Sequence, residues 1–201
     1  MKRKFSVSLF SCVWFAAMIF FDASYLMPLA AAVALHEAGH LLCAAALKIK
    51  VTGFDLSMLG ARMEVDPLRL SYGREFMLAL SGPLAGAVGF LLAYPISHSG
   101  FGSVLSSSLF SFSVISLSLS IFNLIPIDSL DGGRMLRCAV SGLFSPDAAD
   151  AVMKVSTHIT LIFLWLISVY MMLRFFSGLT LFVFSASLFA RFFIFKSKMR
   201  D

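Results

Sequence analysis

Apolar segments long enough to cross a membrane dominate this chain and limit what it can fold into. A helix needs about 20 apolar residues to cross roughly 30 Å of hydrocarbon. The sequence predicts six such helices, near residues 5–21, 25–47, 76–96, 101–125, 156–173 and 178–195. Charged residues make up 13% of the 201 residues, about half the share that is usual in soluble domains. We therefore expect an all-α polytopic membrane protein, with residues 1–201 forming a single domain.

The basic residues predict how these helices are oriented. Lys and Arg gather in the cytoplasmic loops of membrane proteins. If the N-terminus is cytoplasmic, 15 of the 16 basic residues lie on that side and only Arg174 lies outside. Both termini are therefore expected in the cytoplasm. The net charge of +5 follows from this topology, so it does not indicate binding to nucleic acid.

The start of the chain resembles a signal peptide, because a basic end precedes an apolar run. No small-residue cleavage site follows at Phe20, Phe21 and Asp22, so we expect a retained first helix. The predicted cytoplasmic loop at residues 48–75 contains short alternating apolar runs with glycines between them. This pattern is typical of short strands or a hairpin, and an irregular amphipathic loop can show it too. The fold expectation is a short β-like segment, cytoplasmic or re-entrant, after the second helix.

His36, Glu37 and His40 lie in the middle of the second predicted helix, where ionisable residues are costly and indicate a function. Residues four apart share one helix face, so both imidazoles can bind one metal ion. The carboxylate of Glu37 can act as general base toward a metal-bound water. His36 is 11 residues from both Tyr25 and Leu47, or about 16 Å from either end of the helix. The chemistry is therefore expected near the middle of the membrane.

A catalytic zinc site usually has three protein ligands and one open position. The segment NLIPIDSLDGGR at residues 123–134 offers two further carboxylates, Asp128 and Asp131. Asp131 precedes two glycines, which permit close approach to another helix, whereas Asp128 can belong to a loop. Cys43 is a rival donor, but it lies about 10 Å along the helix axis from His36, too far for a compact site. The residues alone leave the two aspartates as alternatives.

Three motifs together resemble the site-2 protease family of intramembrane zinc metalloproteases. They are HEAGH at 36–40, SGPLAG at 81–86 and NLIPIDSLDGGR at 123–134. The resemblance implies one Zn²⁺ per chain, bound by His36, His40 and Asp131. It also implies that Asn123 helps to bind the substrate backbone or to stabilise the intermediate.

The six-helix layout resembles the branch of this family that includes the stage IV sporulation protease, which processes a transcription-factor precursor. That resemblance implies a bacterial cell membrane. Members of the branch commonly carry a C-terminal CBS domain. None is expected here, because the sequence stops at Asp201, six residues after Phe195.

The sequence therefore predicts an endopeptidase that cleaves a membrane-associated protein in or near its membrane segment, as in regulated intramembrane proteolysis. The substrate is expected to dock as an added strand beside residues 48–75. A transporter or metal-ion pathway is one alternative, and it would distribute polar residues through several helices. A catalytically inactive adaptor is another, against which the intact metal motif argues. The substrate, the activating signal, the oligomeric state and any inhibitory membrane partner stay open.

Overall fold

Long apolar helices make up most of the structure, a computed structural model that describes residues 5–7, 25–49, 51–57, 60–65, 71–99, 102–128 and 130–175. Five helices lie in these ranges: α2 (Leu26–Ala46), α3 (Tyr72–Ser97), α4 (Ser103–Asn123), α5 (Asp131–Leu143) and α6 (Pro146–Phe175). Helices α2, α3, α4 and most of α6 are long and apolar enough to cross a membrane. The predicted all-α membrane fold is confirmed for the described part of the chain.

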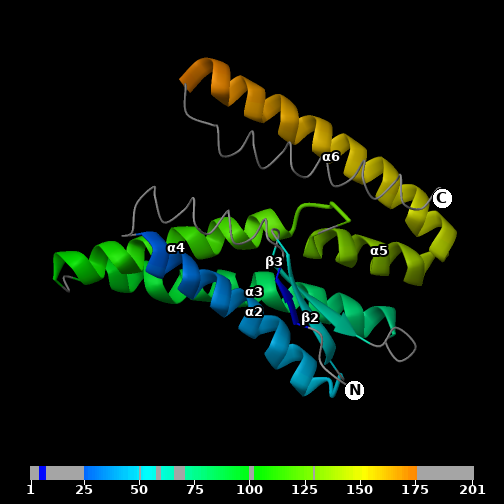
Figure 1. Cartoon of the computed structure of the whole chain (residues 1–201), viewed down its shortest axis with the longest axis horizontal. Helices are drawn as coiled ribbons and strands as arrows, with labels where there is room; N and C mark the ends of the chain where they lie inside the picture. Colours follow the sequence, from blue (N-terminus) through cyan, green and yellow to red (C-terminus); the bar gives the residue numbers. More distant parts are fainter. Residues whose placement is uncertain are drawn as a thin grey trace.

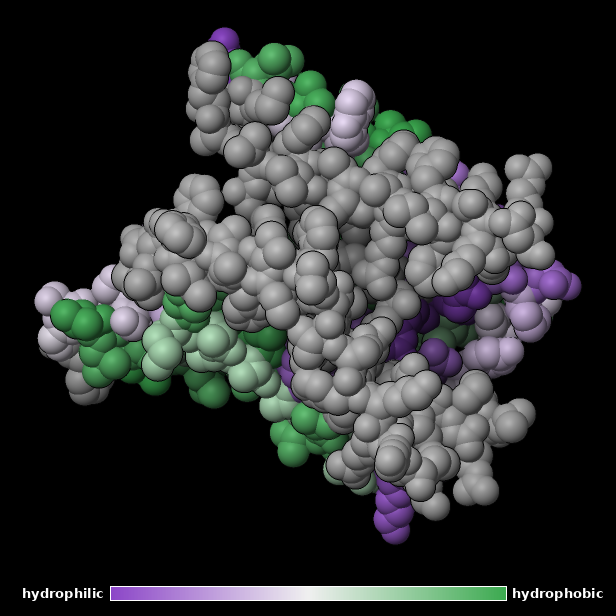
Figure 2. All heavy atoms as spheres, in the orientation of Figure 1, coloured by the Kyte–Doolittle hydropathy of each residue, from purple (hydrophilic) through white to green (hydrophobic). Residues whose placement is uncertain are grey.

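Helix α3 contacts three other helices, namely α2, α4 and α5 (Figure 1). Helix α4 also contacts α2, and α6 packs against α5. Figure 2 shows hydrophobic side chains over the exposed parts of α3 and α4, whereas hydrophilic side chains gather where α5 meets α6. The metal-motif helix α2 and the helix that begins at Asp131 therefore both lie beside α3.

Small residues let α2, α3 and α4 approach one another closely. A Cβ atom added to Gly39 of α2 would lie 2.6 Å from both the Ala85 Cβ and the Ser81 carbonyl oxygen of α3. A Cβ added to Gly86 of α3 would lie 3.0 Å from the Ser116 carbonyl oxygen of α4. Membrane helices associate through this kind of packing, because lipid offers no hydrophobic drive to bring them together. The close contact brings the histidine face of α2 against α3.

A small sheet accompanies the helices, and it lies within the segment predicted to be β-like. Strand β2 (Val51–Ser57) pairs antiparallel with β3 (Gly60–Val65), and Ser57 lies opposite Gly60. Strand β1 (Phe5–Val7) pairs parallel with the other side of β2, so the strand order is β1-β2-β3. The hairpin interpretation of residues 48–75 was therefore correct and the irregular-loop alternative was wrong.

Two helix predictions need correction or lie outside the described residues. The helix predicted near 5–21 is wrong at its start, because Phe5–Val7 is a strand that pairs with β2. The rest of that segment, and the helix predicted near 178–195, fall outside the described residues, so the count of six helices stays a prediction.

The loop predicted at residues 126–155 is also wrong, since it contains α5 and the first turns of α6. Helix α5 has 13 residues of mixed polarity, so a search for apolar spans of about 20 residues cannot find it. Helix α6 begins well before residue 156. Pro146 suits the first position of a helix, and Asp147 favours the first turn through the helix dipole.

Cysteine labelling tests the predicted orientation of these helices. In a variant without native cysteines, Lys48→Cys and Phe144→Cys should react with a membrane-impermeant maleimide only from the cytoplasmic side. His98→Cys should react only from the outer side, because α3 separates its two ends across the membrane. The reverse pattern would contradict the topology.

Candidate metal centre

Helix α2 places two imidazoles side by side against α3. His36 and His40 are buried, with 4% and 8% of their surface exposed. Their ring centroids lie 4.9 Å apart in an edge-to-face arrangement, and their Nε2 atoms are 3.3 Å apart. The spacing of four residues thus brings both Nε2 atoms to one point, as the sequence predicted.

The first residue of α5 brings a carboxylate to the same point. Asp131 Oδ2 lies 3.2 Å from His36 Nε2 and 3.2 Å from His40 Nε2. One donor atom from each of the three residues lies within 4.8 Å of the others, which is compact enough to hold a metal ion. Two imidazole nitrogens and one carboxylate oxygen match the usual protein ligands of catalytic zinc, with one position left open.

Glycines let the chain turn tightly into α5. A Cβ added to Gly132 would overlap the Leu124 carbonyl, and one added to Gly133 would overlap the Ile127 carbonyl. Helix α5 therefore begins directly against the preceding loop, and Asp131 projects from that junction.

Helix α5 is not among the helices that are long and apolar enough to cross a membrane. Burial of the Asp131 carboxyl group disfavours its ionised form. Hydrogen bonds to His36 and His40 outweigh the burial and lower the pKa of Asp131 to about 2.

The backbone of α3 orients His40. The Nδ1 atom of His40 donates a hydrogen bond to the Leu78 carbonyl oxygen over 2.8 Å. The Ser81 hydroxyl donates to the same oxygen over 2.7 Å and lies 3.4 Å from His40 Nδ1. A proton on Nδ1 leaves Nε2 free to bind a metal, as in many metal-binding histidines. No equivalent contact exists for His36, whose buried Nδ1 has no hydrogen-bond partner in the described part of the chain.

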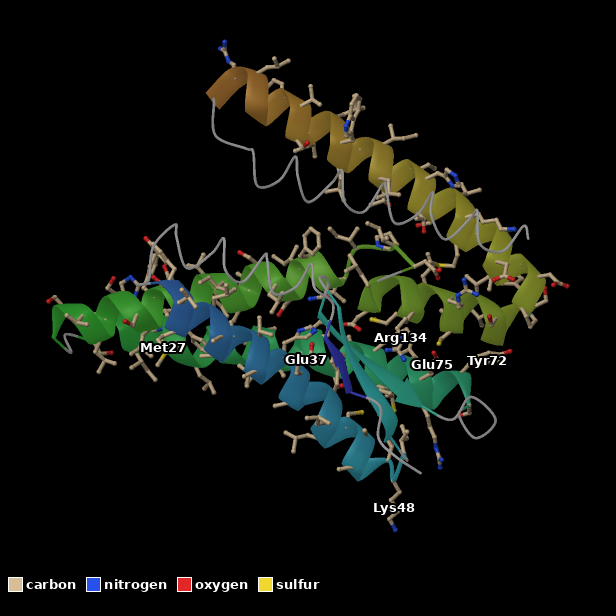
Figure 3. The ribbon with its side chains drawn as sticks, viewed as in Figure 1. Met27, Glu37, Lys48, Tyr72, Glu75 and Arg134 are labelled. Atoms are coloured by element: carbon tan, nitrogen blue, oxygen red, sulfur yellow. The ribbon has the colours of Figure 1, made fainter. Side chains whose placement is uncertain are left out.

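Glu37 follows His36 and is half-buried. Figure 3 shows its side chain beside α2, on the side where the strands are drawn. Glu37 is one residue from His36 and three from His40 along α2, and its role as general base stays a prediction.

Asp128, the rival carboxylate, lies outside the cluster of His36, His40 and Asp131. Its Oδ1 atom accepts a hydrogen bond from Arg137 over 3.0 Å, and 59% of its side chain is exposed. Neither Asp128 nor Cys43 belongs to the cluster that can hold a metal. Of the alternatives that the residues left open, the structure brings only Asp131 to the histidines.

Asn123 ends α4 and is 9% exposed. Its side-chain Nδ2 donates a hydrogen bond to the Leu119 carbonyl of its own helix over 3.0 Å. This hydrogen bond leads back into α4 and does not join Asn123 to the metal ligands, so its role toward a substrate stays a prediction.

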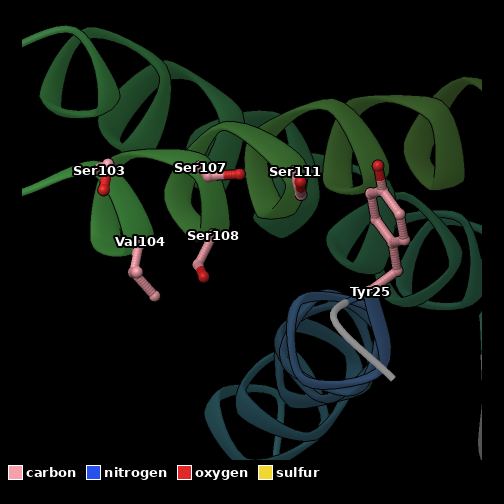
Figure 4. Close-up of a pocket in the computed structure, with 6 residues that line it drawn as sticks. All are labelled: Tyr25, Ser103, Val104, Ser107, Ser108 and Ser111. Atoms are coloured by element: carbon pink, nitrogen blue, oxygen red, sulfur yellow. The ribbon is translucent and has the colours of Figure 1, made fainter. Parts of the chain in front are cut away.

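A separate polar cavity of about 310 Å³ lies between the start of α2 and the start of α4. Figure 4 shows its lining: Tyr25, Ser103, Val104, Ser107, Ser108 and Ser111. Because none of the metal ligands lines it and its lining contains no charged side chain, this cavity is not part of the candidate site.

Sequence reasoning missed two contacts in and near the site. The Leu78 carbonyl that orients His40 is a backbone atom, and every residue type carries one. Arg137 donates hydrogen bonds to Asp128, nine residues before it, and to Asp150, 13 residues after it. Those spacings carry no local pattern, so only the tertiary structure shows them.

Comparisons with known proteins report a matching family profile, two relatives in sequence and one in structure. The profile described as Peptidase family M50 matches residues 84–167. A relative from Synechocystis sp. that carries a zinc-metalloprotease name is 31% identical over 118 residues, which is 55% of this chain and 29% of the relative. A zinc metalloprotease of Methanocaldococcus jannaschii is 30% identical over 115 residues, which is 54% of this chain and 32% of the relative. The chain thus spans less than a third of the length of either relative.

A solved structure, the site-2 protease from Methanocaldococcus jannaschii, superposes with a TM-score of 0.67 and 21% identity. The superposition covers 90% of this chain and 83% of that chain, and it shows that the fold is shared. The described helices and the cluster of His36, His40 and Asp131 define a membrane protein with a site that can hold a metal ion. The resemblance to the site-2 protease family, peptidase family M50, is confirmed.

A pair of glycine variants tests the site geometry. A Cβ at Gly82 would lie 2.8 Å from His36 Nε2 and would overlap the ring of His40, whereas one at Gly73 would meet nothing within 4 Å. Both glycines lie in α3. Gly82→Ala should weaken zinc binding by at least about tenfold, a loss typical of disturbed ligand geometry. Gly73→Ala should leave it unchanged. Chelator competition on the purified proteins measures this, and equal affinities would contradict the geometry.

The two aspartates make a second matched test. Asp131→Ala should remove most of the zinc, because it deletes a donor atom, whereas Asp128→Ala deletes no donor atom and should lose much less. Metal analysis of the purified variants decides between them. Equal losses, or a larger loss for Asp128→Ala, would place the ligand at Asp128.

Proposed function

We propose that this chain is a zinc endopeptidase that hydrolyses a peptide bond in or near the membrane segment of a membrane-associated protein. One observation carries the proposal: His36, His40 and Asp131 converge within 4.8 Å, and Glu37 lies on the same turn of α2. The family resemblance and the zinc-metalloprotease names of two relatives support it.

In this proposal His36, His40 and Asp131 would hold the zinc ion. Such an ion would act as a Lewis acid and would make a water molecule in the site more acidic. The Glu37 carboxylate accepts the proton of the attacking water. It then returns that proton to the amine that leaves when the peptide bond breaks. Asn123 would hold the substrate backbone or the developing oxyanion.

A helical substrate hides its peptide carbonyls behind its own hydrogen bonds and side chains, so it must become extended before cleavage. The sheet offers a way to hold it. Strand β2 is central, and β3 has an outer edge that pairs with no described strand. An extended segment can add to such an edge through main-chain hydrogen bonds. We expect the substrate to dock there with its scissile bond toward Glu37.

The resemblance to the sporulation branch suggests regulated intramembrane proteolysis of a transcription-factor precursor as the process that this cleavage serves. The bacterial cell membrane, with both termini in the cytoplasm, is the location that fits it. Inhibitory membrane partners and a homo-oligomer are compatible with it.

A metal-ion pathway is the alternative, in which the same residues pass metal ions across the membrane and do not hydrolyse a peptide bond. Such a pathway needs ligand groups at several depths. The described residues contain one metal-capable cluster, at one depth, which favours hydrolysis.

The Glu37→Gln variant tests hydrolysis. It should keep the zinc, because Glu37 is not a ligand, and it should abolish cleavage, because the amide cannot accept the proton. Mass spectrometry of new peptide termini in membranes from cells with the wild type and with the variant measures cleavage of any substrate that those membranes contain. New termini that persist in the variant would contradict the mechanism. The complete absence of new termini in both would favour an inactive adaptor.

A pair of proline variants tests strand docking. In an antiparallel pair, the N–H groups of successive residues point to opposite edges. Of Arg62 and Met63 in β3, one therefore donates within the sheet and the other toward the outer edge. Proline lacks the N–H. The variant at the outward position should keep its zinc and lose cleavage. If both Arg62→Pro and Met63→Pro cleave at the wild-type rate, the substrate docks elsewhere.

A further inference from the structure

One arginine connects three parts of the structure next to the metal centre. Arg137 of α5 donates from Nη1 to Asp150 Oδ1 of α6 over 2.6 Å. It also donates from Nη2 to Asp128 Oδ1, in the loop between α4 and α5, over 3.0 Å. A guanidinium suits this task because its donors are fixed in a planar fork and its charge is permanent. The neighbouring carboxylates also raise the pKa of Arg137, against the effect of its partial burial.

Helix α6 binds the same loop through two further hydrogen bonds. The Ser156 hydroxyl donates to the Pro126 carbonyl over 3.0 Å, and the backbone N–H of Asp128 donates to the Thr157 hydroxyl over 3.4 Å. Beneath them, Ile127 and Leu130 of the loop pack with Leu161 of α6, and each of these three residues is 3% exposed. The loop is therefore held on α6 by a buried apolar contact and, at its exposed rim, by Arg137.

This loop determines where Asp131 lies. Gly132 and Gly133 press directly on the Leu124 and Ile127 carbonyls, so a shift of the loop moves the start of α5. The Asp131 carboxylate must stay 3.2 Å from both Nε2 atoms of the histidines on α2. Metal sites tolerate displacements of only about 0.5 Å in their ligands.

We propose that Arg137 is a positioning residue for the third metal ligand: by joining Asp128 to Asp150 it holds the loop on α6 and keeps Asp131 against His36 and His40. The proposal rests on the proposed function, since it assumes that these three residues hold a metal. The Arg137 side chain is 42% exposed, and exposed ion pairs add little to overall stability. Loss of Arg137 should therefore weaken the metal site much more than the fold.

Zinc affinity and the stability of the metal-free protein separate the two roles. Arg137→Gln should raise the zinc Kd by about 10- to 100-fold, the usual effect of removing a residue that supports a metal ligand. The thermal midpoint of the metal-free variant should stay close to that of the wild type. The zinc Kd of Arg137→Lys should lie between those of the wild type and Arg137→Gln. A single ammonium group keeps the charge but cannot reach both carboxylates as the planar guanidinium does. Lys154→Gln, at a cation of α6 that belongs to no ion pair in the described residues, is the matched control and should behave as the wild type.

The salt dependence of zinc binding provides a second readout. Salt screens exposed charge pairs, so raising the ionic strength should weaken zinc binding by the wild type and by Lys154→Gln. In Arg137→Gln this dependence should be much smaller. Asp150→Asn removes half of the bridge and should give an intermediate Kd, which keeps the test available if Arg137→Gln fails to fold.

Three results would overturn the proposal. The first is a zinc Kd in Arg137→Gln equal to that of the wild type. The second is a large fall in the thermal midpoint of the metal-free variant, which would make the role of Arg137 a general structural one. The third is the same salt dependence of zinc binding in the variant as in the wild type. These measurements do not use cleavage. If the wild type binds zinc and cleaves nothing, the proposed function fails while the role of Arg137 is still decided.

Discussion

Two imidazoles and one carboxylate meet inside a group of apolar helices, and most of the surrounding structure can be understood as support for that contact. His36, His40 and Asp131 are at most 9% exposed. Polar groups that are buried this completely are costly unless they are paired or bind a metal. The His36 Nδ1 atom even lacks a hydrogen-bond partner in the described part of the chain. A cost of this kind is tolerated where a function requires it.

Glycine makes the contact sterically feasible from both sides. Gly39 lets α2 lie on α3, and Gly82 leaves room for both imidazoles. On the other side, Gly132 and Gly133 fold the start of α5 onto the preceding loop, so that Asp131 reaches the histidines. Polar contacts add to this packing: His40 donates a hydrogen bond to the Leu78 carbonyl, and Arg137 donates one to Asp128 in the loop that leads into α5. In our proposal, these contacts restrict how the three side chains of the cluster can move.

How much the sequence could predict depended on how local each signal was. The spacing of His36 and His40 on one helix gave their shared face directly, and the alternating pattern of residues 48–75 predicted the β2–β3 hairpin. The choice between Asp128 and Asp131 needed the family resemblance, because both carboxylates belong to one short segment. Helix α5 was missed because its 13 residues carry no apolar span, and Phe5–Val7 was mistaken for helix because its strand partner lies far along the chain. Contacts between distant segments, such as Arg137 with Asp150, leave no pattern in the sequence.

X-ray absorption spectroscopy of the purified zinc-loaded protein tests the central claim most directly. We expect one zinc ion whose nearest shell contains only nitrogen and oxygen at about 2.0–2.2 Å, including two imidazoles and one carboxylate. The Asp131→Asn variant should lose the carboxylate contribution while both imidazoles remain. A sulfur scatterer near about 2.3 Å would assign Cys43 or another thiol to the metal. That result, or a shell that Asp131→Asn leaves unchanged, would contradict a site built from His36, His40 and Asp131.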